Sequence, residues 1–373
     1  MNILIINCIL STSEKGVITR RNSIKDCMIC NFAQGFVSNG HSVTILASEE
    51  FQPLQEESYD FRVVFFPSRW PSVFKPDLIP FPKGMNRWIK ENSSQFDFAI
   101  ASEAFAVSSL IASRCLGRKL IIWQEMDIHQ RKFFKIPARF WYNIIVPLFM
   151  RKSRVVARSE RARKFISQYT HNVSKTCVDH GANGAILFPS DEVKRHFIIV
   201  SRLIAAKGID ISIKSFATLI HNYPQYADFK LLIIGDGDYC ETLKELARQQ
   251  NVEGSVQFHG FMRHEEMALM LRTATAMLIN TLHDLNMVSI PEAIISGTPI
   301  ISNTIPTSAP FIQEHELGVA RANWDETDLA KAIENYPTYH ANCVSIRDTL
   351  TNNGCARTMV KVFETEILPK LNH

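Results

Sequence analysis

The chain has 373 residues, which is enough for two domains with complete hydrophobic cores. Its 46% hydrophobic and 21% charged residues are typical of a soluble globular protein. No stretch approaches about 18 uninterrupted apolar residues, so the sequence predicts no membrane-spanning helix. The apolar N-terminus lacks the basic region and cleavage site of a signal peptide, and we expect it to be a strand.

The net charge of +4 is unevenly distributed along the chain. Residues 1–190 carry 25 basic and 15 acidic side chains, whereas residues 191–373 carry 16 and 22. A basic half followed by an acidic half indicates two domains with different partners.

Short apolar runs alternate with segments of helical period. In the first half we expect helices over 24–39 and 103–116, and strands over 2–7, 42–47, 61–66, 96–101 and 119–124. In the second half we expect strands over 197–202, 230–235, 255–260, 276–280 and 299–303. Nearly continuous Ile, Leu and Val in strands separated by helices predicts parallel sheets covered on both faces. The predicted fold class is therefore α/β, with this pattern occurring twice.

The segment "DHGANGAILFPSDE", residues 179–192, is rich in Gly, Pro and Asn and marks the boundary between the two series. We expect one Rossmann-like domain over 1–185 and a second over 186–354. A final helix within 355–373 is expected to pack back on the first domain. Ligands of such sheets bind at the carboxyl ends of the strands, so the loops after each strand are the candidate sites.

The first candidate site follows the strand 197–202, where "SRLIAAKG" leads into a helix. Arg202 and Lys207 would place two cations beside the N-terminus of that helix. This arrangement suits a pyrophosphate through charge-assisted hydrogen bonds and the helix dipole. Taken alone, two solvated basic residues in a loop are an equally good interpretation.

Two short patterns suggest metal or redox chemistry but have simpler explanations. Asp236 and Asp238 form a D-x-D, but Gly and Asp between a strand and a helix also fit a tight turn with an N-cap. Cys27 and Cys30 form a C-x-x-C without a second pair, in a segment that resembles an amphipathic helix. We therefore expect no metal site and reduced cysteines.

The strongest pattern of acids lies in "LHDLNMVSIPEAIISGTPII", residues 282–301. A helix is expected from about Ser289, with Glu292 in its first turn. There the helix dipole could stabilise the Glu292 carboxylate, or the carboxylate could hold two ribose hydroxyls. Asp284 precedes the helix and could hold sugar hydroxyls. Free N–H groups are expected at the helix start, contributed by Met287, Val288 and Ser289. After the earlier strand 255–260, the backbone of Phe261 and Met262 could read a nucleobase edge. His259 and His264 are expected to be structural.

In order, "SRLIAAKG", "IIGDG", "VQFHGF", the acid–seven residues–acid segment and "SGTPII" resemble the C-terminal domain of family 4 retaining glycosyltransferases. The strings "GHSVTILA" at 40–47 and "HGANGAILFP" at 180–189 are similar to the family's first domain and linker. The resemblance implies the GT-B architecture, in which two Rossmann-like domains with parallel sheets face each other across a cleft.

The resemblance also implies roles for individual residues. Arg202 and Lys207 would bind the donor diphosphate, Glu292 the donor ribose, and Asp284 the transferred sugar. The family usually has Glu where Asp284 stands, followed by Gly-Phe-Gly where this chain has Leu285–Asn286–Met287. The family is metal-independent, so no cofactor is expected beyond the nucleotide-sugar co-substrate.

The first domain resembles the family less. Only Gly16 stands where the family has a glycine-rich phosphate loop, and the family's cleft histidine has no clear counterpart. The segment "QEMDIHQ" offers Glu125 and Asp127 as groups that could assist the acceptor hydroxyl. In a front-face mechanism the leaving diphosphate takes the acceptor proton, and Arg202 and Lys207 matter more than any base.

Residues 131–164 carry 11 basic side chains and a single acid, Glu160, with aromatic residues interleaved. Such a segment can dock on anionic lipid headgroups, and an ordinary basic surface helix is an equally good interpretation. No nucleic-acid-binding module accompanies it, so no nucleic acid partner is expected.

The resemblance implies a retaining, metal-independent glycosyltransferase that moves a sugar from a UDP- or GDP-linked donor to a glycan or polyprenol-linked acceptor. Surface polysaccharide biosynthesis, in the cytoplasm or at the inner face of the cell membrane, is the expected setting. The alternatives are a GT-B-fold sugar-nucleotide 2-epimerase and a non-catalytic nucleotide-sugar-binding subunit. An NAD enzyme is disfavoured because no G-x-G-x-x-G follows the first strand.

Overall fold

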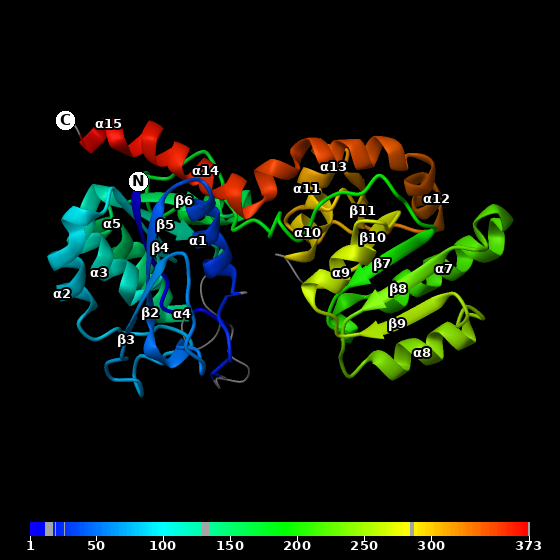
Figure 1. The fold of residues 1–373 in the computed structure, drawn as a ribbon, viewed down its shortest axis with the longest axis horizontal. Helices are drawn as coiled ribbons and strands as arrows, with labels where there is room; N and C mark the ends of the chain where they lie inside the picture. Colours follow the sequence, from blue (N-terminus) through cyan, green and yellow to red (C-terminus); the bar gives the residue numbers. More distant parts are fainter. Residues whose placement is uncertain (12–17, 19, 26, 129–134, 284–286, 372–373) are drawn as a thin grey trace. The chain divides into compact units, whose positions relative to one another are not determined.

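The computed structural model describes residues 1–11, 18, 20–25, 27–128, 135–283 and 287–371. The chain forms two compact units (Figure 1). Unit 1 comprises residues 1–181 together with 352–373, and unit 2 comprises residues 182–351. The chain crosses from unit 1 to unit 2 after residue 181, four residues before the predicted boundary at 185/186. It crosses back after residue 351, three residues before the predicted boundary at 354/355. In the described ranges, no helix combines the length and apolar character that a membrane span requires.

Unit 1 is built on a six-stranded parallel sheet with the order β3-β2-β1-β4-β5-β6. Its strands are β1 (Asn2–Ile6), β2 (Ser42–Ser48), β3 (Arg62–Phe66), β4 (Phe98–Ser102), β5 (Leu120–Gln124) and β6 (Arg154–Ala157). The described helices before the first crossing are α1 (Met28–Ser38), η1 (Glu49–Phe51), α2 (Met85–Asn92), η2 (Ser93–Gln95), α3 (Val107–Leu116), η3 (Gly117–Lys119), α4 (Lys135–Phe140), η5 (Trp141–Ile145), α5 (Val146–Phe149) and α6 (Glu160–Ile166). After the second crossing come α14 (Asn352–Val362), η8 (Phe363–Ile367) and α15 (Leu368–Leu371).

Both faces of this sheet are buried, because alternate residues of each strand point to opposite sides. Ile3 and Ile5 pack on the side of α1, whereas Leu4 and Ile6 pack into a second cluster on the other side. Because both sides of β1 face a core, its sequence is apolar from Ile3 to Ile6 without a break.

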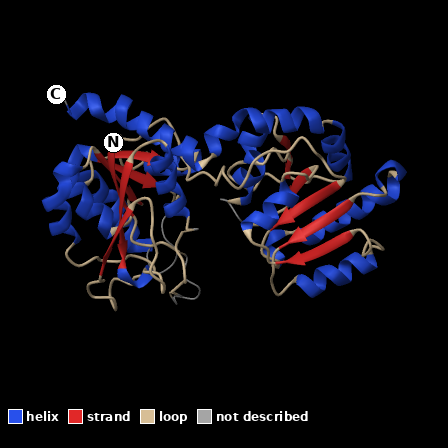
Figure 2. Ribbon diagram, in the orientation of Figure 1, coloured by secondary structure: helices blue, strands red, loops and turns tan. Residues whose placement is uncertain are grey.

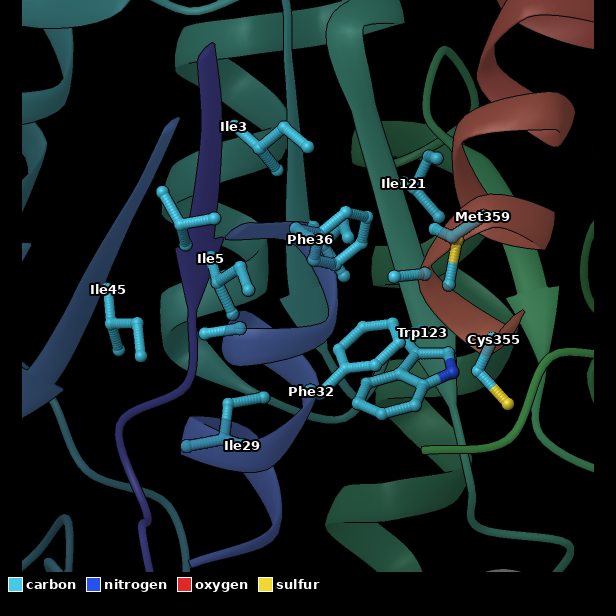
Figure 3. Close-up of a cluster of buried hydrophobic side chains, with 14 of the residues drawn as sticks. Ile3, Ile5, Ile29, Phe32, Phe36, Ile45, Ile121, Trp123, Cys355 and Met359 are labelled. Atoms are coloured by element: carbon cyan, nitrogen blue, oxygen red, sulfur yellow. The ribbon is translucent and has the colours of Figure 1, made fainter. Parts of the chain in front are cut away.

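The C-terminal segment completes the core of unit 1 on the side of α1. Helix α14 packs against α1, and Figure 3 shows Met359 beside Ile121 and the stacked rings of Phe32 and Trp123. A Cβ atom at Gly35 would lie 2.3 Å from the carbonyl oxygen of Asn352, so glycine permits this close approach.

Unit 2 repeats the design with a parallel sheet of order β12-β11-β10-β7-β8-β9 (Figure 2). Its strands are β7 (His196–Val200), β8 (Lys230–Ile234), β9 (Val256–Gly260), β10 (Ala276–Ile279), β11 (Ile300–Ser302) and β12 (Gly318–Ala320). Its described helices are η6 (Ala205–Lys207), α7 (Ile209–Asn222), η7 (Pro224–Tyr226), α8 (Cys240–Gln249), α9 (His264–Leu271), α10 (Ser289–Ile295), α11 (Ala309–Glu314), α12 (Glu326–Glu334) and α13 (Tyr336–Leu350). The predicted α/β class with two parallel sheets is thus confirmed, and β6 and β12 are strands that the apolar pattern missed.

The predicted helices over 24–39 and 103–116 begin too early, since α1 starts at Met28 and α3 at Val107. The buried Cys27 caps α1, and its sulfur accepts a hydrogen bond from the N–H of Cys30 at 3.4 Å. The C-x-x-C is therefore part of a helix start. Before α3, Glu103 has φ +66°, which no helix accommodates.

Candidate functional site

The loops at the carboxyl ends of β7 and β10 meet at the centre of unit 2. The chain runs outward from β7 through β8 to β9 and then returns to β10 on the other side of β7. This reversal is the topological switch point, where open α/β sheets bind ligands. Gly208, in the β7 loop, has φ +60°, and a Cβ atom there would lie 2.0 Å from the carbonyl oxygen of Asn280 in the β10 loop. Only glycine fits such a backbone contact.

The loop after β8 closes on the same place. Leu203 donates its N–H to the carbonyl of Asp236 at 2.9 Å and accepts from the N–H of Tyr239 at 3.0 Å. The Asp236 carboxylate accepts from the N–H of Gly237 at 2.8 Å, so it stabilises the turn as predicted. The N-cap prediction for this Asp pair is wrong, because α8 starts at Cys240 with Tyr239 as its cap residue and no side-chain cap.

Lys207 ends the short helix η6 directly before α7, and it lines a small hollow together with Ser201, Asn280 and Met287. Arg202 is exposed two residues after β7. Both predicted cations therefore lie on the switch-point loop beside the N-terminus of α7.

Glu292 lies in the first turn of α10 and is 8% exposed. Its Oε1 is 3.3 Å from Nε2 of His264, the first residue of α9. Sequence reasoning treated His264 as structural and missed this pairing, because the two residues are 28 positions apart. Phe261 is exposed and Met262 half-buried between β9 and α9.

The predicted ribose carboxylate, that of Glu292, therefore has a polar neighbour at the start of α9, His264. Val288 is exposed, while Met287 and Ser289 are half-buried at the start of α10. Asp284 and Gly16 lie outside the described residues.

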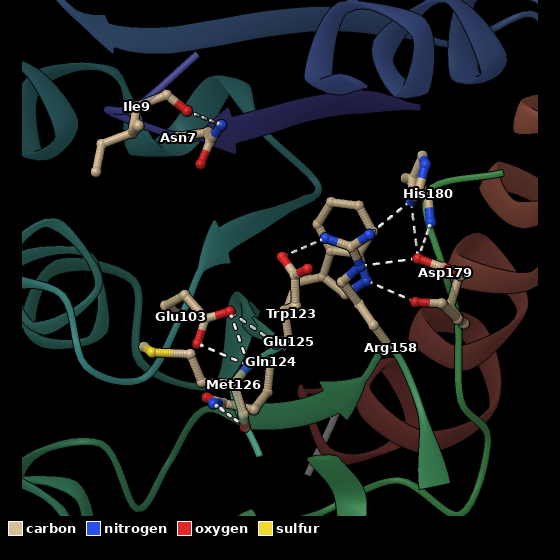
Figure 4. A network of polar contacts seen from close by, with 11 residues as sticks. Asn7, Ile9, Glu103, Trp123, Gln124, Glu125, Met126, Arg158, Asp179 and His180 are labelled. Atoms are coloured by element: carbon tan, nitrogen blue, oxygen red, sulfur yellow. Dashed lines mark hydrogen bonds and ion pairs between the residues drawn. The ribbon is translucent and has the colours of Figure 1, made fainter. Parts of the chain in front are cut away.

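Unit 1 contains a cavity of about 510 Å³ at the carboxyl ends of β1, β4 and β5. It also occupies a topological switch point, because β1 neighbours both β2 and β4. Its polar lining residues include Asn7 after β1, Glu103 after β4, and Glu125 after β5 (Figure 4). Its apolar lining residues include Phe105 and Trp123.

The Glu103 carboxylate accepts hydrogen bonds from the N–H of Glu125 at 2.7 Å and from the N–H of Met126 at 3.3 Å. Burial, followed by the charge of Glu125, raises the pKa of Glu103 to about 8. Glu125 was predicted as a candidate for this domain, but Glu103 was not, since residues 103–116 have helical periodicity.

Arg158, directly after β6, connects the cavity to the segment that leaves unit 1. Its guanidinium donates to Asp179 at 2.8 Å and to Glu125 at 2.5 Å, and it lies 2.6 Å from Nδ1 of His180 (Figure 4). Burial opposes the positive charge, but Asp179 and Glu125 outweigh it and raise the pKa of Arg158. Burial also acts on Asp179, where Arg158 outweighs it and lowers the pKa of the carboxyl. Both groups are therefore charged at neutral pH.

The two acids predicted to assist the acceptor are each held by an arginine. Glu125 pairs with Arg158, and the Asp127 carboxylate lies 2.5 Å from Nε of Arg161. Among the described residues, no group of three His, Cys, Asp or Glu side chains is arranged to hold a metal ion.

The described residues of the basic segment 131–164 do not form one basic surface, and its predicted membrane contact stays a prediction. Arg154 pairs with Glu366 of the C-terminal segment, and Arg158 is buried in the network above. The run of helices α4, η5 and α5 instead exposes apolar side chains. We call these the apolar ridge: Ile136, Phe140, Ile144, Leu148 and Phe149.

Residues 188–338 match the family model described as "Glycosyl transferases group 1". An alpha-monoglucosyldiacylglycerol synthase of Streptococcus pneumoniae is 26% identical over 48% of this chain and 43% of its own length. An uncharacterized glycosyltransferase of Haemophilus influenzae is 21% identical over 82% of this chain and 84% of its own length. The chain thus spans less than half of the Streptococcus pneumoniae relative.

Among solved structures, HepE of Anabaena in complex with UDP superposes with a TM-score of 0.67, at 17% identity, over 98% of this chain and 100% of HepE. This similarity confirms the predicted GT-B fold of two Rossmann-like domains.

Proposed function

We propose that the protein transfers a sugar from a nucleotide-diphospho-sugar to an acceptor hydroxyl with retention of configuration. The match of residues 188–338 to the glycosyl transferases group 1 model supports this proposal. The observation that carries this proposal is the switch point of unit 2. There Lys207 precedes α7, and the buried Glu292 lies in the first turn of α10. The family match covers both residues.

The reaction requires stabilisation of the negative charge that develops on the leaving diphosphate. Arg202 and Lys207 would supply it, together with the N-terminus of α7. The bond between the sugar carbon and the phosphate oxygen breaks, and its electron pair stays on the diphosphate. The acceptor oxygen forms the new bond on the same face of the sugar, and its proton passes to the leaving diphosphate. No metal is needed in this scheme.

Glu292 would accept hydrogen bonds from the donor ribose, and Asp284 would contact the transferred sugar. The backbone at Phe261 and Met262 would face the nucleobase, and the start of α10, from Met287 to Ser289, would lie near the phosphates. HepE was solved with UDP and also with UDP-glucose, which supports a uridine donor for this chain.

The test incubates the protein with UDP- and GDP-sugars and measures nucleotide release. We expect one donor to turn over, with at least a hundredfold loss in Lys207→Ala and in Glu292→Ala. Lys214→Ala, which removes an exposed lysine on the adjacent helix α7, is the matched control and should retain activity. Interconversion of the sugar nucleotide without release would favour the epimerase, and binding without turnover across acceptors would favour the non-catalytic subunit.

The acceptor is proposed to be glycan- or lipid-linked, with the protein held at the inner face of the cell membrane by the apolar ridge. Large apolar side chains at four-residue spacing, from Ile136 to Leu148, are exposed on one helical run. That run has Lys135 and Arg139 at one end and Arg151 and Lys152 just beyond the other, and no acid lies between residues 135 and 152. Apolar insertion flanked by basic side chains suits an anionic lipid surface.

Leu148→Ser should weaken sedimentation with vesicles of phosphatidylglycerol at least threefold. Leu54→Ser is the matched control, because Leu54 and Leu148 are both 60% exposed in unit 1 and only Leu148 belongs to the ridge. Equal binding of the two variants would exclude the ridge as the contact.

A further inference from the structure

The cavity of unit 1 has a chemistry distinct from that of the donor residues, all of which lie in unit 2 or outside the described part of the chain. Among the described residues, its charged lining residues are Asp77, Glu103, Glu125 and Arg158. Arg158 is already paired with two carboxylates, so three of the four charged groups in this described lining are acidic and the fourth is neutralised. Such a lining repels phosphates and carboxylates and suits hydroxyl or ammonium groups.

Glu103 is held in an unusual backbone conformation. Its φ of +66° lies in the left-handed region, which is strained for a residue other than glycine. Strain of this kind persists where surrounding contacts fix it, and it clusters at functional sites. Here the fixing contacts are the N–H of Glu103 on the carbonyl of Trp123 at 3.0 Å and the N–H of Ala104 on the side-chain oxygen of Gln124 at 3.0 Å.

These contacts join the ends of β4 and β5 and hold Glu103 in the lining of the cavity. The N–H groups of Glu125 and Met126 then fix the orientation of its oxygens. Figure 4 shows Glu103 on one side of Glu125, the residue after β5, and Arg158 on the other side. The group is therefore oriented in advance, as recognition of a hydroxyl requires.

The cavity wall supplies the complementary apolar surface. Phe105 and Trp123 line it together with Leu78, Ile79 and Pro80. A sugar ring presents hydroxyls at its edge and C–H groups on its faces, so it matches a lining in which carboxylates face apolar side chains.

We propose that this cavity binds a neutral or amino sugar ring of the acceptor, with a ring hydroxyl hydrogen bonded to Glu103, and that it excludes anionic sugars. The proposal rests on the proposed glycosyl transfer for the identity of the ligand as the acceptor. The raised pKa of Glu103 supports it, since a carboxyl protonated at neutral pH can donate to a hydroxyl while accepting from the two amides. Any phosphate of a lipid-linked acceptor must then lie outside the cavity.

The test measures binding of three methyl glycosides to the full chain by saturation-transfer difference NMR: glucoside, glucosaminide and glucuronide. We expect the glucoside or the glucosaminide to bind, and the glucuronide to bind at least tenfold more weakly. Glu103→Ala should weaken the binding at least tenfold and Glu103→Gln less, because the amide retains one hydrogen bond to the sugar.

Glu57→Gln is the matched control, because the Glu57 carboxylate also accepts from a backbone N–H, that of Ile24 at 3.1 Å, but does not line the cavity. It should bind the glycosides as the unmodified chain does. Calorimetric titration of UDP into the same variants tests folding and the donor site independently of glycoside binding. Glycoside binding without UDP binding would count against the proposed donor and leave the cavity assigned. Absence of glycoside binding, equal binding of the glucuronide, or unchanged binding in Glu103→Ala would each overturn the cavity proposal.

Discussion

Removal of the Arg158 guanidinium should destabilise unit 1 measurably. The Arg158 side chain is 10% exposed, and Arg158→Met would leave the carboxylates of Glu125 and Asp179 without their shared partner. Breaking a buried ion pair in this way costs about 3–5 kcal/mol. Glu125 and Asp179 keep 42% and 43% of their side chains exposed, so water can solvate them and reduce the loss. We therefore expect a loss of about 3 kcal/mol, at the lower end of that range.

Differential scanning calorimetry is the suitable assay, because the two units can unfold in separate transitions. For a unit of this size, a loss of 3 kcal/mol corresponds to a fall in Tm of about 6–12 °C. Arg87→Met, which breaks the exposed pair with Glu91, should lower Tm by no more than about 3 °C. A similar small fall in Arg158→Met would refute the reasoning.

The pH dependence of the same measurement has a definite sign. The pKa of Asp179 is lowered in the folded state, so its ion pair contributes stability above the unfolded value, near 4, and loses it as pH falls below that value. The deficit of Arg158→Met should therefore be full at pH 7 and shrink below about pH 4. A deficit that stays constant down to pH 3 would show that lost packing, and not charge, is responsible.

Two further predictions concern the switch points. Because the pKa of Glu103 is raised from 4.5 to about 8, its proton stabilises the folded state fully below the lower value, and this stability is lost as pH rises through about 8. Glu103→Gln should remove the part of the fall in Tm between pH 5 and 8.5 that comes from deprotonation of Glu103. An unchanged fall would contradict the raised pKa of Glu103. Gly208→Ala should weaken UDP binding at least tenfold, because φ is +60° and the added methyl would lie 2.0 Å from a loop carbonyl. Gly254→Ala, which has no neighbour within 4 Å, should leave UDP binding unchanged in the same calorimetric titration.

The architecture could be predicted from the sequence because it depends on local patterns. Runs such as "ILII" at 3–6 and "LLII" at 231–234 are apolar at every position, which identifies strands buried on both faces. Lys207 and Gly208 could be placed at a helix start for the same reason, since the local sequence leads from a strand directly into a helix there.

In the cavity of unit 1, Glu125 was a predicted candidate, but its neighbours could not be predicted, because they depend on contacts between distant residues. Glu103 meets the N–H of Glu125 only when β4 and β5 pair in register, 22 residues apart. Arg158 finds its partners 33 and 21 residues away. The apolar ridge could not be predicted for another reason. The sequence shows that residues 135–149 are mostly apolar and aromatic, but it does not show which of these side chains face the core, as Ala138 and Tyr142 do, and which face the solvent.

The return of the chain to unit 1 at Asn352 affects how the protein is made. Residues 182–351 are continuous and can fold as soon as they leave the ribosome, whereas unit 1 must wait until all of unit 2 has been synthesised. During that interval the side of α1 and β4 that later receives Met359 and Phe363 stays uncovered, including Phe98, whose ring stacks on Phe363 at 4.5 Å. The N-terminal part of the nascent chain therefore presents an apolar surface that is covered only after residues 352–367 have been synthesised.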